Sequence, residues 1–166
     1  MTLRTASISA VLLLLVGSLS AQSLLASNWD NPLALPDGSP APAVIPPSPA
    51  EQREVQQNVR DIHFDFNQAD LRAEDRSALD QDAQWLKAHP DMLVTIEGDA
   101  DERGGIVYNV ALSEKRASVT KDALVSMGVP ADQIVFATGW GKLYPICFTS
   151  DESCWSQNRR AHFAAW

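Results

Sequence analysis

The sequence predicts an α/β (α+β) domain in which strands and helices alternate, preceded by an N-terminal tether that has no core of its own. Short segments of alternating or β-branched apolar residues are typical of strands. Two longer segments between them carry apolar side chains at helical spacing. The resulting order, strand–helix–strand–helix–strand, implies right-handed crossovers and at least partly parallel pairing.

The N-terminus is typical of an exported chain. Residues 6–19 are apolar and small residues follow them, which predicts a signal peptide over residues 1–21 or an uncleaved signal anchor. Residues 22–60 are expected to form a Pro-rich, disordered linker that ends in a polar, helix-compatible lead-in. The folded domain is expected over residues 61–166.

The elements of this domain follow from local patterns and stop signals. Strands are expected at residues 61–66, 92–97, 133–138 and 161–166, and helices at residues 73–88 and 109–127. Gly98 is expected to end the second strand, and the glycines of the run 139–141 the third. Gly128 followed by Pro130 is a stop signal for the second helix.

Arg116 falls inside the apolar stripe of the second predicted helix. A guanidinium group does not deprotonate, and burying it without a partner is costly. One alternative is therefore a structural ion pair with Asp101 or Asp99 in the acidic loop that precedes the helix. The other is a ligand clamp, in which Asp101 takes the ammonium group and Arg116 the carboxylate of a zwitterionic amino-acid end.

Charge and cysteine content narrow the function further. The formal net charge of −8 argues against a nucleic-acid partner. Cys147 and Cys154 lie close together and, behind an export signal, predict a disulfide. No cofactor or metal is expected, and no nucleophile–base arrangement indicates an enzyme. A metal-dependent hydrolase using the acidic residues near Asp101 is the enzymatic alternative.

A set of short motifs runs in order from Ile62 to the C-terminus. They are Phe64–Asp65–Phe66, Asp70–Leu71–Arg72, Glu97–Gly98, the run from Ala100 to Gly104, Tyr108–Asn109, Leu112, Arg116–Ala117, and the run from Asn158 to Ala161. In order and spacing this set resembles the OmpA-like peptidoglycan-binding domain, and within it the branch of peptidoglycan-associated lipoproteins (Pal). The resemblance implies a split βαβ sheet backed by helices, and a pocket for meso-diaminopimelate of the peptidoglycan stem peptide.

The resemblance also assigns roles to residues of the pocket. Asp101 matches the acidic ligand of the family and Arg116 the basic one. The other ligand-binding positions that it implies are Asn109, Leu112, Phe64, Asp65 and Arg103, with Asp99, Arg159 and Arg160 in support. Simpler readings stay open for several of them: a helix N-cap for Asn109, and core packing for Leu112 and Phe64. Asp99 stands where the family usually has His, which is expected to alter ligand affinity or its pH range.

The function implied by the resemblance is non-catalytic peptidoglycan binding. Such a protein links the outer membrane to the wall as a Pal-like component of the Tol-Pal system in cell division, with TolB-like or TolA-like partners and a periplasmic, outer-membrane-associated location. No Cys occurs at residues 17–27, so the lipid anchor of the family is not expected and the mode of anchoring stays open. The alternative is a Tol-type protein-interaction component whose wall binding is weak or lost.

Overall fold

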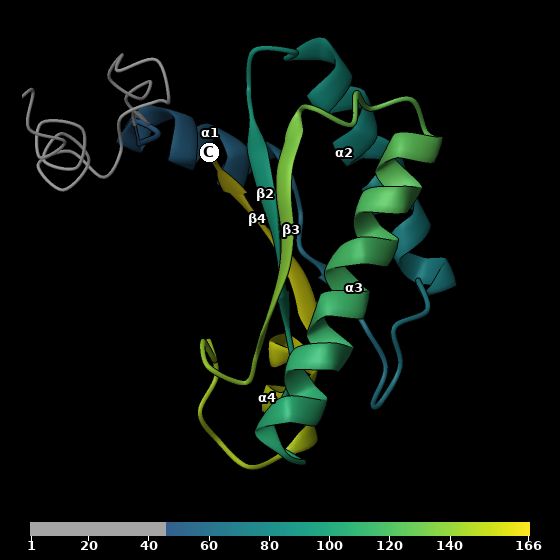
Figure 1. Ribbon diagram of the computed structural model, residues 1–166, viewed down its shortest axis with the longest axis vertical. Coiled ribbons are helices and arrows are strands. Elements are labelled where there is room, and N and C mark those ends of the chain that lie inside the picture. Colours follow the sequence, from purple (N-terminus) through teal and green to yellow (C-terminus); the bar gives the residue numbers. More distant parts are fainter. Residues whose placement is uncertain (1–45) are drawn as a thin grey trace, which may run out of the picture. The chain divides into compact units, whose positions relative to one another are not determined.

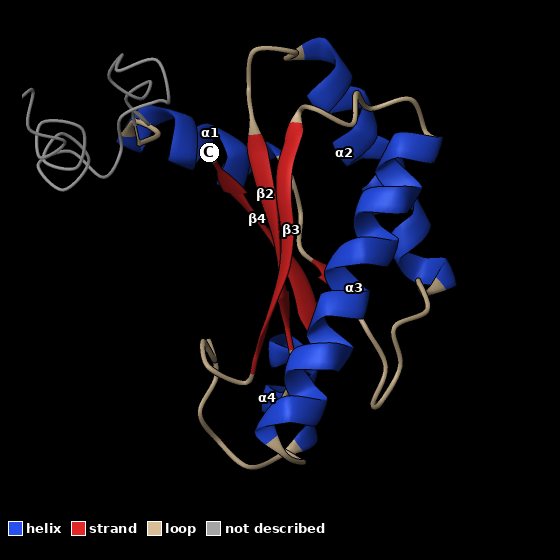
Figure 2. Ribbon diagram, viewed as in Figure 1, coloured by secondary structure: helices blue, strands red, loops and turns tan. Residues whose placement is uncertain are grey.

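The computed structural model describes residues 46–166; the predicted signal and most of the Pro-rich linker lie outside the described residues. Figures 1 and 2 show the arrangement of helices and strands. In chain order the elements are α1 (Pro49–Asn58), β1 (Ile62–His63), the short 3₁₀ helix η2 (Ala73–Asp75), α2 (Arg76–Ala88), β2 (Val94–Asp99), α3 (Ile106–Ser126), β3 (Ile134–Gly141), α4 (Glu152–Asn158) and β4 (Arg160–Ala165).

The four strands form one mixed sheet in the order β1-β4-β2-β3. Strands β2 and β3 are parallel, whereas β4 is antiparallel to both β2 and β1. Helices α2 and α3 lie on the same side of the sheet (Figure 1). The predicted α/β class and the partly parallel pairing are therefore confirmed, and the C-terminal strand lies between the first and second strands.

The core lies between the sheet and the helices. Ile96 and Phe163, which are register partners on β2 and β4, are both buried in it. Helix α1 contributes Val55 to the same core, so the helix-compatible lead-in packs against the folded domain. A capping box at Ser48 and Glu51 fixes the start of α1.

Two glycines let α3 approach the sheet at backbone distance. A Cβ atom on Gly98 would lie 1.9 Å from the carbonyl oxygen of Ser113, and one on Gly139 would lie 2.2 Å from the backbone nitrogen of Glu114. The prediction that these glycines end their strands was wrong. Strands β2 and β3 continue through them, because the glycines serve close packing against the helix and do not interrupt strand pairing.

Two elements begin or end differently from the prediction. Helix α3 starts three residues early, at Ile106, with Gly105 as N-cap, so Asn109 is not a cap and lies buried in the first turn. Strand β1 stops after His63, although the N–H of Phe64 still donates to the carbonyl of Arg159 at 2.9 Å. The chain then turns at Asn67, whose φ is +58°.

A helix that the sequence patterns did not predict, α4, begins between the cysteines and runs past Cys154 to Asn158. The predicted disulfide joins Cys147 to Cys154, the latter within α4. The carboxylate of Asp151 caps α4 by accepting a hydrogen bond from the N–H of Cys154. This cap and the disulfide position the short helix beside the acidic loop.

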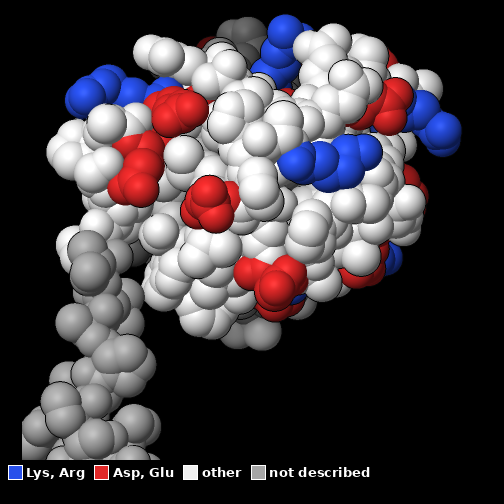
Figure 3. Space-filling model, turned by 90° about the horizontal axis from the view of Figure 1, so that it is seen from above, with Lys and Arg blue, Asp and Glu red and all other residues white. Residues whose placement is uncertain are grey.

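Residues 46–166 show two further global features. No helix among them is long and apolar enough to cross a membrane. Acidic and basic side chains are interspersed on the face drawn in Figure 3, so the net negative charge is not gathered into one patch on that face.

Candidate functional site

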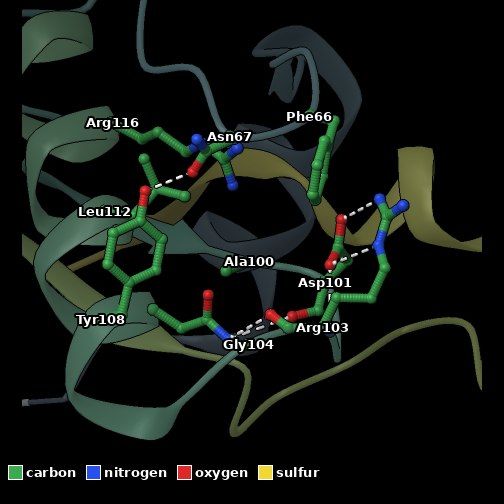
Figure 4. A pocket seen from close by; sticks show the side chains of 10 residues that line it. Phe66, Asn67, Ala100, Asp101, Arg103, Gly104, Tyr108, Leu112 and Arg116 are labelled. Atoms are coloured by element: carbon green, nitrogen blue, oxygen red, sulfur yellow. Dashed lines mark hydrogen bonds and ion pairs between the residues drawn. The ribbon is translucent and has the colours of Figure 1, made fainter.

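A small pocket opens where the loop after β2, the first turns of α3 and the turn after β1 meet (Figure 4). Its volume is about 100 Å³. The lining residues are Phe66, Asn67, Ala100, Asp101, Arg103, Gly104, Tyr108, Asn109, Leu112 and Arg116. The structure thus brings together five residues predicted from the sequence: Asp101, Arg103, Asn109, Leu112 and Arg116.

Arg116 reaches the pocket from α3 and is completely buried, at 0% exposure. Its guanidinium donates three hydrogen bonds, all to main-chain carbonyls: Nε to Gln68 at 2.9 Å, Nη1 to Asp99 at 2.8 Å and Nη2 to Asp65 at 3.2 Å. Among residues 46–166 no carboxylate lies within ion-pair distance of it. The alternative of a structural ion pair with Asp101 or Asp99 is therefore wrong.

The environment of Arg116 disfavours its charge. Burial lowers its pKa to about 10, and the nearby positive charge of Arg159 acts in the same direction. The ring of Phe64 lies beneath the guanidinium, 5.2 Å from ring centroid to Cζ, which offers weak cation–π stabilisation. The pocket consequently contains a positive charge that has no ion-pair partner among the described residues, although the more distant charges of Asp101 and Asp99 favour it.

Asp101, by contrast, is fully engaged. Its carboxylate accepts hydrogen bonds from the backbone N–H and the Nε of Arg103, both at 3.1 Å, and from Nη2 of Arg103 at 2.7 Å. Nη1 of Arg159 approaches the same carboxylate at 3.3 Å. Burial raises the pKa of Asp101, but the hydrogen bonds from these two arginines outweigh it and hold the pKa below its usual value.

Two aromatic rings lie against the guanidinium of Arg103. The rings of Phe66 and Trp155 each lie 4.0 Å from its Cζ atom, measured to the ring centroid. The indole N–H of Trp155 also donates to the carboxylate of Glu102 at 2.9 Å. Helix α4, which carries Trp155, therefore orders the loop at residues 101–103, which is called here the acidic wall of the pocket.

Asn109, Gly104 and Leu112 complete the pocket at the loop between β2 and α3 and along the start of α3. Asn109 donates from Nδ2 to the carbonyls of Arg103 at 2.9 Å and Asp101 at 3.4 Å, and its Oδ1 accepts no hydrogen bond from the described residues. Gly104 adopts a positive φ of 89° in this loop, a conformation that favours glycine. Leu112 lies partly buried one turn further along α3 and supplies apolar lining.

Other predicted residues lie outside the pocket. Phe64 is a buried core residue beneath Arg116, and Asp65 contributes its carbonyl while its side chain lines a neighbouring depression. The carboxylate of Asp99 pairs with Arg160 at 2.9 Å and does not line the pocket. Burial raises the pKa of Asp99 to about 6 although Arg160 opposes the shift.

Five pocket residues were missed by reasoning from the sequence: Phe66, Asn67, Ala100, Gly104 and Tyr108. Tyr108 carried a usable signal, because it lies one helical turn before Leu112 and shares its face. The inward position of Phe66 and Asn67 depends on β1 ending at His63, which local patterns did not indicate. Tyr108 donates a short hydrogen bond from its hydroxyl to Oδ1 of Asn67 (Figure 4).

Residues 46–166 contain no cluster of three or more His, Cys, Asp or Glu side chains arranged to hold a metal ion. The pocket chemistry is instead that of charge recognition: a buried cation beside an acidic loop that the side chain of Asn109 supports. Such an arrangement is suited to a small ligand that carries a carboxylate group.

Comparison with known proteins places this fold and site in a family. A model of the OmpA family matches residues 63–160, which contain all of β2 and β3, the last residue of β1 and the first residue of β4. The chain therefore belongs to the OmpA family.

Within that family the chain is similar to peptidoglycan-associated lipoproteins. It is 46% identical over 115 residues to that of Rhizobium meliloti (strain 1021), covering 69% of this chain and 65% of the relative. It is 41% identical to that of Brucella suis biovar 1, covering 69% and 68%. The matched segment thus spans slightly less than two thirds of the Rhizobium protein.

Solved structures agree with this placement. The crystal structure of the peptidoglycan-associated lipoprotein from Burkholderia pseudomallei has a TM-score of 0.62 and 39% identity, covering 64% of this chain and 90% of that one. The C-terminal domain of Helicobacter pylori MotB has a TM-score of 0.60 at 16% identity, covering 65% and 84%. At that identity the second likeness shows the fold alone.

Proposed function

We propose that this protein binds peptidoglycan without catalysing a reaction on it, by holding the free zwitterionic end of meso-diaminopimelate in the pocket around Arg116. The observation that carries the proposal is the buried guanidinium of Arg116, which has no acidic partner among the described residues. A buried charge left unpaired is costly. A ligand carboxylate is the natural partner for it.

The geometry modifies the simple clamp expected from the sequence. Of the five N–H groups of Arg116, three donate to carbonyls, which leaves two for a ligand carboxylate. Asp101 already accepts hydrogen bonds from Arg103 and Arg159. It therefore attracts the ligand ammonium group by its negative charge from the acidic wall. The unused Oδ1 of Asn109 is the acceptor available to that ammonium group.

The relatives support a wider role in the cell envelope. Proteins named peptidoglycan-associated lipoproteins match this chain over 115 residues, and the match to the OmpA family contains every pocket residue. By analogy we place this chain in the periplasm, associated with the outer membrane, as a Pal-like component of the Tol-Pal system in cell division, with TolB-like or TolA-like partners.

Co-sedimentation with purified diaminopimelate-type sacculi tests the proposal. The wild-type protein should pellet with the sacculi, and Arg116→Lys should not, because a lysine cannot hold a carboxylate in a two-pronged geometry. Arg76→Lys is the matched control, since Arg76 is exposed on α2 away from the pocket. Free diaminopimelate should compete, whereas Nα-acetyl-lysine amide, which carries an ammonium group but no carboxylate, should not. A folded wild-type protein that stays in the supernatant would refute wall binding.

A second candidate function is a protein-interaction component with weak or lost wall binding. The observation in its favour is an exposed apolar segment between β3 and α4, formed by Leu143, Tyr144, Ile146 and Phe148. Exposed apolar groups of this kind often mark binding surfaces. This function predicts that the protein fails to pellet with sacculi yet binds a TolB-like protein, and that Phe148→Ser weakens this interaction.

A further inference from the structure

A second depression continues from the pocket along α3. It has a volume of about 290 Å³ and is lined by Asn67, Gln68, Ala69, Asp70, Tyr108, Ala111, Leu112 and Lys115. Tyr108, Ala111, Leu112 and Lys115 stand at i, i+3, i+4 and i+7, so they form one continuous stripe on the helix. The turn at residues 67–70 forms the opposite wall.

The depression and the pocket share three lining residues: Asn67, Tyr108 and Leu112. The hydrogen bond from the Tyr108 hydroxyl to Oδ1 of Asn67 joins two of these shared residues (Figure 4). Asn67 holds its side chain there from a left-handed backbone conformation, which asparagine tolerates better than most residues. A ligand whose end lies in the pocket can therefore extend past this pair into the depression.

The pocket alone is too small for a peptide. Its volume of about 100 Å³ compares with roughly 300–1,000 Å³ for sites that enclose a drug-sized ligand. Only the charged end of an amino acid fits, so the residues joined to it lie outside. The depression along α3 is the adjoining concave surface that can take them.

The charges of the depression define what it accepts. Lys115 is exposed on the helix stripe, and none of the ion pairs within residues 46–166 uses it. Asp70 lies on the facing turn, likewise exposed and outside those ion pairs. The ammonium group of Lys115 is thus available to an acidic ligand, while Asp70 disfavours a second carboxylate on its own side.

We propose that the depression along α3 is a second subsite for the same ligand, in which Lys115 pairs with a free carboxylate on the residue adjoining diaminopimelate in the wall peptide. This inference rests on the proposed function of the pocket. It makes the ligand an acidic peptide of at least two residues, recognised at Arg116 in the pocket and at Lys115 in the depression, which are neighbours in the sequence but lie about 100° apart around α3.

Calorimetric titration of the full-length protein tests this subsite with three ligands. They are free meso-diaminopimelate, a peptide in which the γ-carboxyl group of D-glutamate is joined to diaminopimelate and the α-carboxylate is free, and the same peptide with that carboxylate amidated. The wild-type protein should bind the acidic peptide about threefold more tightly than the amidated one, the range expected of an exposed ion pair. The difference should shrink at high salt.

Two variants locate the effect. In Lys115→Met the ratio between acidic and amidated peptide should fall to one, whereas Lys87→Met, an exposed lysine near the C-terminus of α2, should keep the wild-type ratio. A ratio of one in the wild type, or a ratio that survives in Lys115→Met, overturns the subsite while leaving the pocket intact. Failure of all three ligands to bind the wild-type protein overturns both the subsite and the proposed function.

Discussion

Replacing Asp82 with asparagine should change how the stability of this protein depends on pH. Asp82 lies on α2 at 0% exposure, and only one of its carboxylate oxygens has a partner, the backbone N–H of Arg60 at 3.1 Å. The other oxygen, Oδ2, is buried without one. Burial raises the pKa of Asp82 from 3.8 to about 7, with Arg60 opposing the shift.

The sign follows from proton binding. Between about pH 4 and pH 7 the folded protein keeps the proton of Asp82 while the unfolded chain releases it, so stability falls as pH rises through this range. At about 1.4 kcal/mol per pKa unit, the shift corresponds to a loss of up to about 4 kcal/mol on passing from pH 4 to pH 8. Asp82→Asn removes this titration, although its buried amide N–H group lacks a partner and costs about 1–3 kcal/mol.

Urea denaturation at pH 4.5, 6 and 8 measures this effect. The difference in unfolding free energy between Asp82→Asn and wild type should move in favour of the variant by a few kcal/mol as pH rises. Other groups such as Asp99, whose pKa is about 6, cancel in the difference because both proteins contain them. Asp80→Asn, an exposed position on the same helix, is the matched control. Parallel pH curves for Asp82→Asn and wild type would refute the reasoning.

Three further predictions follow from the packing and from the acidic wall. Gly98→Ala should destabilise the fold by about 1–3 kcal/mol or more in thermal or urea unfolding, because the new methyl group meets the main chain of α3. An unchanged unfolding midpoint would mean that the helix can move to admit the methyl group. Trp155→Ala should weaken the binding of meso-diaminopimelate about two- to fivefold in calorimetric titration, because one of the rings against Arg103 is lost. Trp155→Phe should keep most of the affinity. Equal losses in the two variants would exclude stacking as the cause. The double variant Cys147→Ser, Cys154→Ser should lose about 2 kcal/mol of stability, and wild type under reducing conditions should match it.

Local patterns in the sequence predicted the class of fold well. Periodicity placed α2 and the body of α3, and β-branched runs placed β2 and β3, because these signals depend on neighbours along the chain. The predicted ends of β2 at Gly98 and of β3 at Gly139 were less accurate. Whether a glycine stops a strand or admits a helix depends on what packs against it, and this information lies in the residues of α3.

The sequence by itself determined that Arg116 falls on the buried face of a helix, that Asp101 belongs to a loop beside it, and that the motifs match one family. The tertiary structure alone decided their partners. Arg116 binds carbonyls of Gln68 and Asp65, and Arg159 occupies Asp101, through contacts between residues 48, 51 and 58 positions apart. Such pairings depend on where β1 ends and how β4 enters the sheet, and no periodic pattern encodes those distances. The sequence thus supplied the charged groups, and the fold gave the acid its arginine partners but gave Arg116 only main-chain carbonyls among the described residues.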